Sequence, residues 1–232
     1  MRNAIPFKAE VVLALAKDKV KDLKKLVEEQ RAAIEDEYKT IEKGVELFAE
    51  ETEKPQYILP EEIQDNLIDA IYACHNGVLR MIPAYPNVVE TSSNLAIIDI
   101  NEGRADFKIL ARSAREDMKE YLATQLQCCF NMAGMKVECS ASYGGWDPNP
   151  DSEVLKMLMQ IYRDQNGEDA IVQVDHAGLE CSIILGKYPN MDVVSFGPNI
   201  RSPHTAGERC EVASCEPFWK LLVKALEEVP NK

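Results

Sequence analysis

The chain has 232 residues, of which 46% are hydrophobic and 28% are charged, a composition that allows a sizeable core and argues against intrinsic disorder. Its formal net charge is −13. That balance argues against a nucleic acid or an anionic membrane surface as partner, because both attract proteins rich in Lys and Arg.

The sequence carries no recognisable export or membrane signal. No apolar run approaches the length that spans a bilayer, and residues 1–6 lack the apolar stretch and cleavage site of a signal peptide. The seven cysteines are odd in number and form no C-x-x-C pair. Reduced thiols in the cytoplasm are therefore expected.

The first part of the chain predicts helices packed on a sheet. Apolar and β-branched residues predict a strand at 7–16, and apolar residues at helical spacing predict an amphipathic helix at 18–41. Two acidic residues open a second helix at Glu61. The other expected elements are a strand at 45–50, an irregular connection at 76–86, a hairpin of strands at 88–100 and 105–111, a helix at 114–132 and a strand at 135–143. This order predicts an antiparallel or mixed sheet with helices on one face.

The run at 144–150, Gly-Gly-Trp-Asp-Pro-Asn-Pro, is the clearest break in the chain. Strands and helices alternate beyond it, which is typical of an α/β layer. The elements expected there are helices at 152–164, after Gly178 and at 216–226, and strands at 170–174, 192–196 and 208–213. We therefore expect an α/β protein with an α+β domain at 1–147, built on a mixed or antiparallel sheet, and an α/β segment at 148–232.

Three histidines are the first candidates for chemistry. His75 ends an apolar helix without acidic neighbours at ligand spacing, so a structural role is expected. His204 stands in a loop stiffened by proline and glycine after a predicted strand, a setting that suits a zinc ligand, although a lone loop histidine is more often a surface residue. His176 precedes Gly178 at the start of a predicted helix, which is compatible with ligand binding and equally with an ordinary turn.

Other catalytic signatures are missing from the sequence. It contains no phosphate-binding loop, dinucleotide fingerprint, nucleophile elbow or H-x-D motif. Cys128 and Cys129 lie within a predicted amphipathic helix, where packing explains them better than nucleophilic catalysis.

Ordered blocks in the last third of the chain resemble the aminoacyl-histidine dipeptidases, also called Xaa-His or cytosol non-specific dipeptidases. The blocks are DHAGLEC at 175–181, YPNMD at 188–192, SFGP at 195–198 and SPH at 202–204, and RNAIP at 2–6 and YGGWDP at 143–148 resemble the family's lid. The resemblance covers essentially the whole chain. It implies a split di-zinc α/β catalytic domain with an inserted, dimerisation-like lid domain, of which 1–147 would be the later lid portion and 148–232 the second catalytic segment.

The resemblance also implies roles for particular residues. His204 corresponds to the family's last zinc ligand, and Gly178 and Glu180 to a turn that lines the substrate end of the site. Asn94 and Arg112 correspond by their positions in strands to lid residues that face the substrate. Two zinc ions would share a bridging water, a glutamate would take its proton, and the hydroxide would attack the carbonyl of a dipeptide.

The family's remaining metal ligands and its catalytic Glu-Glu pair lie upstream of the lid and have no counterpart in this sequence. One histidine cannot hold two zinc ions, since each takes three or four protein ligands. We therefore expect this chain, as a fragment, to bind zinc weakly and to be inactive alone, with no catalytic residue of its own.

The alternative is a stand-alone, non-catalytic module that uses the sheet of the first domain for dimerisation or binding. The retained His204 block favours a piece of a dipeptidase, because an interaction module has no use for a zinc-ligand loop. An incomplete α/β layer exposes a sheet edge and an apolar face, so a homo-oligomer is expected.

Overall fold

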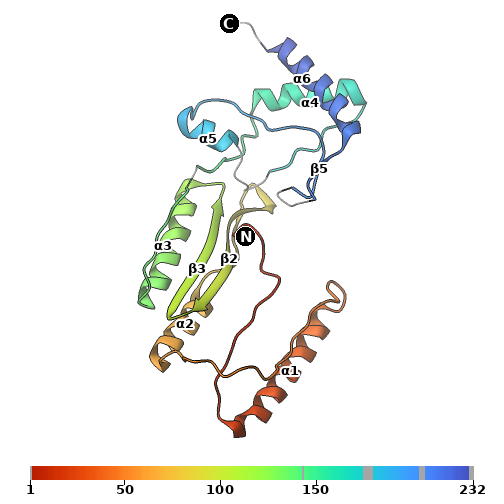
Figure 1. Cartoon of the computed structure of the whole chain (residues 1–232). Coiled ribbons are helices and arrows are strands. Elements are labelled where there is room, and N and C mark those ends of the chain that lie inside the picture. Colours follow the sequence, from red (N-terminus) through yellow and green to blue (C-terminus); the bar gives the residue numbers. More distant parts are fainter. Residues whose placement is uncertain (1, 143, 175–179, 204–206, 230–232) are drawn as a thin grey trace. The chain divides into compact units, whose positions relative to one another are not determined.

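The computed structural model describes residues 2–142, 144–174, 180–203 and 207–229 (Figure 1). The chain divides into two compact units, Pro6–Ile68 and Met1–Ile5 with Asp69–Lys232. The domain boundary expected near residue 147 falls inside the larger unit and stays a prediction. No helix in the described ranges is long and apolar enough to cross a membrane.

The smaller unit is built around one helix. A 3-10 turn, η1 (Lys17–Lys19), leads into α1 (Val20–Tyr38), which confirms the amphipathic helix expected at 18–41. The strands expected at 7–16 and 45–50 are wrong, because neither segment is assigned to a strand. An apolar, β-branched run is only a potential strand; it becomes one when a neighbouring chain segment supplies the hydrogen bonds.

A three-stranded antiparallel sheet, in the order β1-β2-β3, organises the first part of the larger unit (Figure 1). Its strands are β1 (Gly77–Ile82), β2 (Tyr85–Asn101) and β3 (Arg104–Ser113). The expected hairpin is confirmed, and its turn places Glu102 and Gly103 at positive φ, 49° and 76°. The irregular connection expected at 76–86 is wrong: most of it is β1, whose pairing with β2 is interrupted by register shifts.

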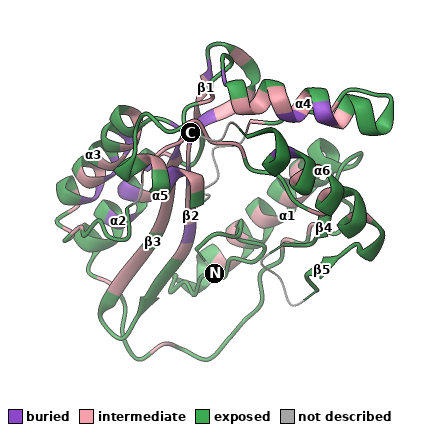
Figure 2. Ribbon diagram, turned by 90° about the horizontal axis from the view of Figure 1, so that it is seen from above, coloured by how far each residue is buried: buried purple, intermediate pink, exposed green. Residues whose placement is uncertain are grey.

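The helix α3 (Glu116–Met132) packs on one face of this sheet, and Ala70, near the end of α2 (Glu61–Ala73), belongs to the same buried cluster. Both helices are close to their predicted positions. On α3, Leu122, Leu126 and Phe130 recur every four residues and are buried, so they form one stripe, against which Phe107 and Ile109 of β3 pack. Figure 2 shows buried residues on both α3 and β2. The rings of Phe107 on β3 and Phe130 lie 5.0 Å apart.

The same core encloses Cys74, whose side chain is buried with Ala70 and Leu122. Burial, together with the nearby Cys129, raises the pKa of the Cys74 thiol to about 11. Met135 and Val137 also pack against this core, but of the strand expected at 135–143 the described residues 135–142 are not assigned to a strand.

The last part of the chain carries three helices, all near their predicted positions: α4 (Glu153–Asn166), α5 (Glu180–Lys187) and α6 (Cys215–Glu228). Leu158 and Ile161 of α4 pack against Ala225 of α6. A short antiparallel pair, β4 (Ile200–Arg201) and β5 (Arg209–Cys210), and the 3-10 turn η2 (Val212–Ser214) precede α6.

The α/β layer expected in this part is incomplete. The strand at 208–213 is reduced to β5, and 170–174 and 192–196 are not assigned to strands. The described strands are all antiparallel and are combined with helices, as expected for the α+β domain at 1–147.

Asp192, the last residue of the YPNMD block at 188–192, has a structural role: its side chain caps the N-terminus of α4. Its Oδ2 accepts a hydrogen bond from the Val154 main-chain N–H at 3.0 Å, beside the N-cap Ser152, whose Oγ accepts from Leu155 N at 3.0 Å. The Ser152 hydroxyl and the Val154 N–H stabilise the charged carboxylate and lower the pKa of Asp192.

We expect Asp192→Asn to lower the free energy of unfolding by up to about 1 kcal/mol at pH 7, the usual worth of a carboxylate charge near a helix N-terminus, because the amide oxygen keeps an acceptor for the Val154 N–H. A carboxyl with a depressed pKa contributes stability that is present above its unfolded pKa, about 4, and is lost as the pH falls through the folded pKa. The difference between wild type and variant should therefore shrink from pH 5 toward pH 3 in urea unfolding. Asp99→Asn, on an exposed part of β2, is the control and should change stability by less than about 0.5 kcal/mol. An equal loss at pH 3 and pH 7 would contradict the capping role.

Candidate substrate-binding site

Asn94 and Arg112 project from one face of the sheet. Arg112 on β3 lies opposite Ser92 on β2, and Asn94 lies opposite Leu110. Because side chains alternate along a strand, Asn94 and Arg112 are diagonal neighbours on the same face. The opposite face carries the residues that pack on the helices: Leu95, Phe107, Ile109 and Ala111. The structure therefore brings together the two predicted lid residues, on the face away from the core helices.

The Asn94 amide binds main-chain carbonyls in this structure. Its Nδ2 donates to the carbonyl oxygens of Arg2 at 3.2 Å and Ala4 at 2.9 Å. The segment at 2–4 thus runs along this face of the sheet, and the half-buried Asn94 shows a geometry suited to holding a peptide backbone. Arg112 is half-buried at the end of β3, where its planar guanidinium is suited to a carboxylate.

The glycine pair at 144–145 lies between the sheet and α5. A side chain on Gly145 would overlap the main-chain carbonyl of Ala114, at the end of β3, and would lie 3.0 Å from Arg115 N. A Cβ on Gly144 would lie 3.5 Å from the carbonyl oxygen of Ser182 in α5. The glycines therefore join the end of the strand that carries Arg112 to the helix that begins at Glu180.

The predicted site residues in the last part of the chain are only partly placed. Glu180 is the exposed first residue of α5. Gly178 and His204 lie outside the described residues, as does His176. Within the described ranges, no group of three or more His, Cys, Asp or Glu side chains could hold a metal ion. The described residues thus do not fit a zinc ion, and the zinc ligand at His204 stays a prediction.

His75 has the structural role that its sequence context predicts. Its ring Nδ1 lies 2.7 Å from Ser93 Oγ, and this hydroxyl also donates to the main-chain carbonyl of His75 at 2.7 Å. The residue thereby anchors the start of β1 to β2.

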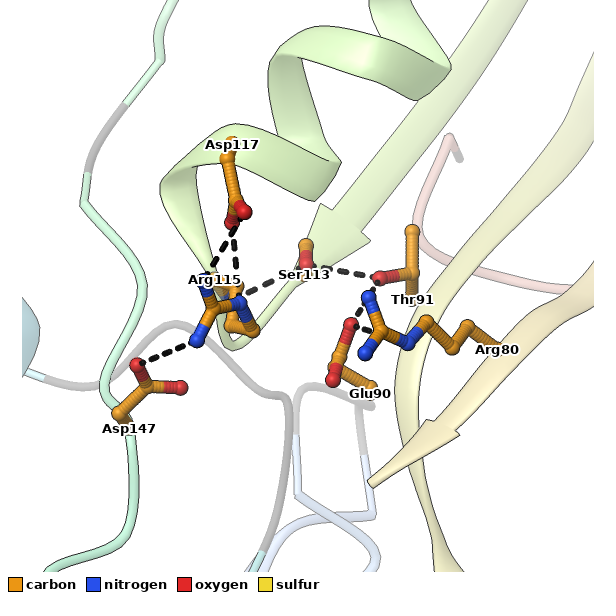
Figure 3. Close-up of polar contacts among 7 residues, drawn as sticks. All are labelled: Arg80, Glu90, Thr91, Ser113, Arg115, Asp117 and Asp147. Atoms are coloured by element: carbon orange, nitrogen blue, oxygen red, sulfur yellow. Dashed lines mark hydrogen bonds and ion pairs between the residues drawn. The ribbon is translucent and has the colours of Figure 1, made fainter. Parts of the chain in front are cut away.

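A buried polar network at the end of the sheet was missed by the sequence analysis (Figure 3). Glu90 is 1% exposed, and its carboxylate lies 3.4 Å from Arg80 Nε and accepts from the hydroxyl of the buried Thr91. Thr91 Oγ1 lies 2.8 Å from Ser113 Oγ, which accepts from Arg115 N at 3.1 Å. The signal for this network was present in the sequence: the polar run at 90–94 interrupts the apolar pattern of a central strand.

Arg115 extends this network to the glycine-rich segment. Its guanidinium donates to both carboxylate oxygens of Asp117, at 3.0 and 2.9 Å, and lies 3.7 Å from the carboxylate of Asp147 (Figure 3). The hydrogen bond with Arg115 holds the pKa of Asp117 below its ordinary value. The strand end, the first turn of α3 and the segment after Gly145 are therefore linked by polar contacts.

Helices combined with antiparallel strands place the chain in the mixed α and β class, and its fold matches part of a solved peptidase. The structure is similar to a crystal structure of aminoacylhistidine dipeptidase from Vibrio alginolyticus, with a TM-score of 0.82 and 33% sequence identity over 94% of this chain and 44% of that one. The sequence is 33% identical, over all 232 residues, to the cytosol non-specific dipeptidase of Escherichia coli K12, of which it covers 48%. No family model matches the sequence. The chain therefore resembles the carboxy-terminal part of the aminoacyl-histidine dipeptidases, as its sequence blocks predict, and it spans about half the length of these relatives.

Proposed function

We propose that this chain supplies the substrate-binding part of a zinc-dependent cytoplasmic dipeptidase that hydrolyses Xaa-His and other dipeptides. Residues 1–147 would form the later portion of the lid and 148–232 the carboxy-terminal catalytic segment. The observation that carries the proposal is the placement of Asn94 and Arg112 on one face of the sheet, in a chain whose fold matches a dipeptidase.

Each of the two lid residues suits one part of a dipeptide. The guanidinium of Arg112 would bind the terminal carboxylate through two parallel hydrogen bonds. The amide of Asn94 would bind main-chain oxygen, as it does with Arg2 and Ala4 in this structure. Gly178 and Glu180 would line the other end of the substrate. His204 would be one zinc ligand, and the other ligands and the catalytic glutamate would come from another polypeptide segment.

The experiment is a reconstitution. This chain and the amino-terminal half of the E. coli relative are prepared separately, then assayed with an Xaa-His dipeptide and Zn²⁺, alone and mixed. We expect hydrolysis from the mixture only. Within the mixture, Arg112→Gln should lower kcat/KM about 10- to 100-fold, the worth of a charge-assisted hydrogen bond to the carboxylate. Arg104→Gln, on the exposed start of the same strand, should leave kcat/KM unchanged.

Two outcomes would overturn the proposal. Full dipeptidase activity from this chain alone would show that it needs no further ligands. An inactive mixture, combined with zinc binding that His204→Ala does not change, would exclude a role in a dipeptidase.

The second candidate is a non-catalytic module that associates with itself. Extended segments of the last part of the chain expose apolar side chains, among them Ile171 and Val172, which are 88% and 48% exposed. For such a module, size-exclusion chromatography with light scattering should show a stable oligomer whose mass the amino-terminal half does not change. Replacement of the oligomer by a complex of the two halves would instead support the dipeptidase.

A further inference from the structure

Two exposed cysteines meet where the β4–β5 pair joins α6. Cys210 ends β5 and Cys215 begins α6, and their Sγ atoms lie 3.7 Å apart. All seven cysteines of the chain are free. We propose that Cys210 and Cys215 form a modification site, at which a hydroperoxide oxidises the two thiols to an intramolecular disulfide.

Hydrogen bonds fix the turn between the two cysteines. Glu211 N donates to the carbonyl oxygen of Asn199 at 2.9 Å, while Ser214 N and Ser214 Oγ donate to the carbonyl oxygen of Glu211 at 3.0 and 2.6 Å. Asn199 N donates to Ser214 Oγ at 2.8 Å. Both cysteine thiols also approach the Glu211 carbonyl oxygen, at 3.9 and 3.8 Å.

This turn preorganises the thiols for bond formation. A disulfide bond is about 2.0 Å long, so the sulfurs must approach each other by less than about 2 Å. Rotation of exposed side chains can provide that movement while the hydrogen-bonded turn stays in place. The reacting groups are therefore already held as neighbours, which makes the second step intramolecular.

The reaction balances with a hydroperoxide as the oxidant. One thiolate attacks the outer peroxide oxygen, the O–O bond breaks, and a sulfenic acid and an alcohol, or water from H₂O₂, are formed. The second sulfur attacks the sulfenic sulfur, its proton leaves with the hydroxyl as water, and the S–S bond forms. The hydrogen bond to Cys215 raises the pKa of Cys210, so oxidation should quicken as the pH rises.

The disulfide would add a covalent link between the β4–β5 pair and α6. Cys210 pairs with Ile200 of β4, and the connection between the two short strands contains His204. A covalent bond to the first residue of α6 would tie the base of this connection to the helix. Oxidation would thereby fix Cys210 of β5 to the start of α6, and the chemistry of the thiol pair is independent of the proposed dipeptidase function.

The test uses the reduced full chain. The chain is treated with H₂O₂, its remaining thiols are alkylated with iodoacetamide, and it is digested. The peptide masses are then measured by mass spectrometry with and without prior reduction. We expect a product in which Cys210 and Cys215 are joined and have lost two hydrogen atoms. It should form at least about 10-fold faster than any disulfide to another cysteine, because the partners are already neighbours. A thiol reductant should restore both alkylation sites.

Matched variants separate this pair from general thiol oxidation. Cys210→Ser and Cys215→Ser should each abolish the product, whereas the double variant Cys128→Ser, Cys139→Ser, which removes two other exposed thiols, should form it at the wild-type rate. Circular dichroism checks that each variant is folded. The proposal is overturned if wild-type protein yields only sulfinic acids or intermolecular disulfides at these two positions.

Discussion

Replacement of Arg80 by methionine is expected to lower the free energy of unfolding by about 3 kcal/mol, the usual cost of leaving one partner of a buried ion pair without the other. The side chain of Glu90 is 2% exposed and that of Arg80 is 40% exposed, with 3.4 Å between Arg80 Nε and Glu90 Oε1. Methionine keeps most of the arginine's apolar stem but removes the charge. The buried carboxylate of Glu90 then loses its ion pair with Arg80.

Replacement of the other partner, Glu90, should lower the free energy of unfolding by less, because the side chain of Arg80 is more exposed than that of Glu90. In Glu90→Gln the charge left without its partner is that of Arg80, which reaches water, so we expect a loss of about 1 kcal/mol. In the double variant the buried carboxylate is gone, and its stability should exceed that of Arg80→Met alone. Urea unfolding at pH 7 measures all three variants. Equal losses from the two single variants, or losses that add in the double variant, would show that the pair does not act as described.

The helices of this fold could be predicted from sequence because their signals are local. The amphipathic pattern at 152–164 is enough to predict α4. Its N-cap Ser152 begins that stretch, and its C-cap Gly167, at a φ of 74°, follows three residues after the end of the stretch. The strands at 7–16 and 170–174 failed for the opposite reason. Their patterns are those of strands, but a strand forms only when a second segment pairs with it through main-chain hydrogen bonds. Which segments lie side by side depends on the whole fold.

In the candidate site, too, some features could be predicted from the sequence and others could not. The resemblance was sufficient to select Asn94 and Arg112, but their shared face was not predictable from the hairpin alone, because it depends on the register shift between Leu95 and Ile97. The capping role of Asp192 was not predictable, because Val154 lies 38 positions earlier in the chain. The network from Arg80 to Asp147 depends on several such distant contacts, so sequence reasoning had only the interrupted apolar pattern at 90–94 to indicate it.

Gly145→Ala is the second substitution with a large expected effect, again about 3 kcal/mol, the upper end of the cost of overpacking. The added methyl group would overlap the carbonyl group of Ala114, which is main chain and cannot rotate away as a side chain can. Either the end of β3 or the glycine-rich segment must move. The ion pair between Arg115 and Asp147 spans this contact, so it should weaken with the shift.

Gly186→Ala provides the matched control for this substitution. It adds the same methyl group to α5, where no atom beyond the neighbouring residues and the local helix backbone lies within 4 Å of the new Cβ. It should be neutral or stabilise the protein by up to about 1 kcal/mol, because alanine favours a helix. Thermal and urea unfolding of both variants measure the difference. If Gly145→Ala unfolds like the control, the close approach between Gly145 and Ala114 does not contribute to stability. If it unfolds earlier, as expected, the glycine is required because the main chain of the sheet leaves no room for a side chain there, two residues beyond Arg112.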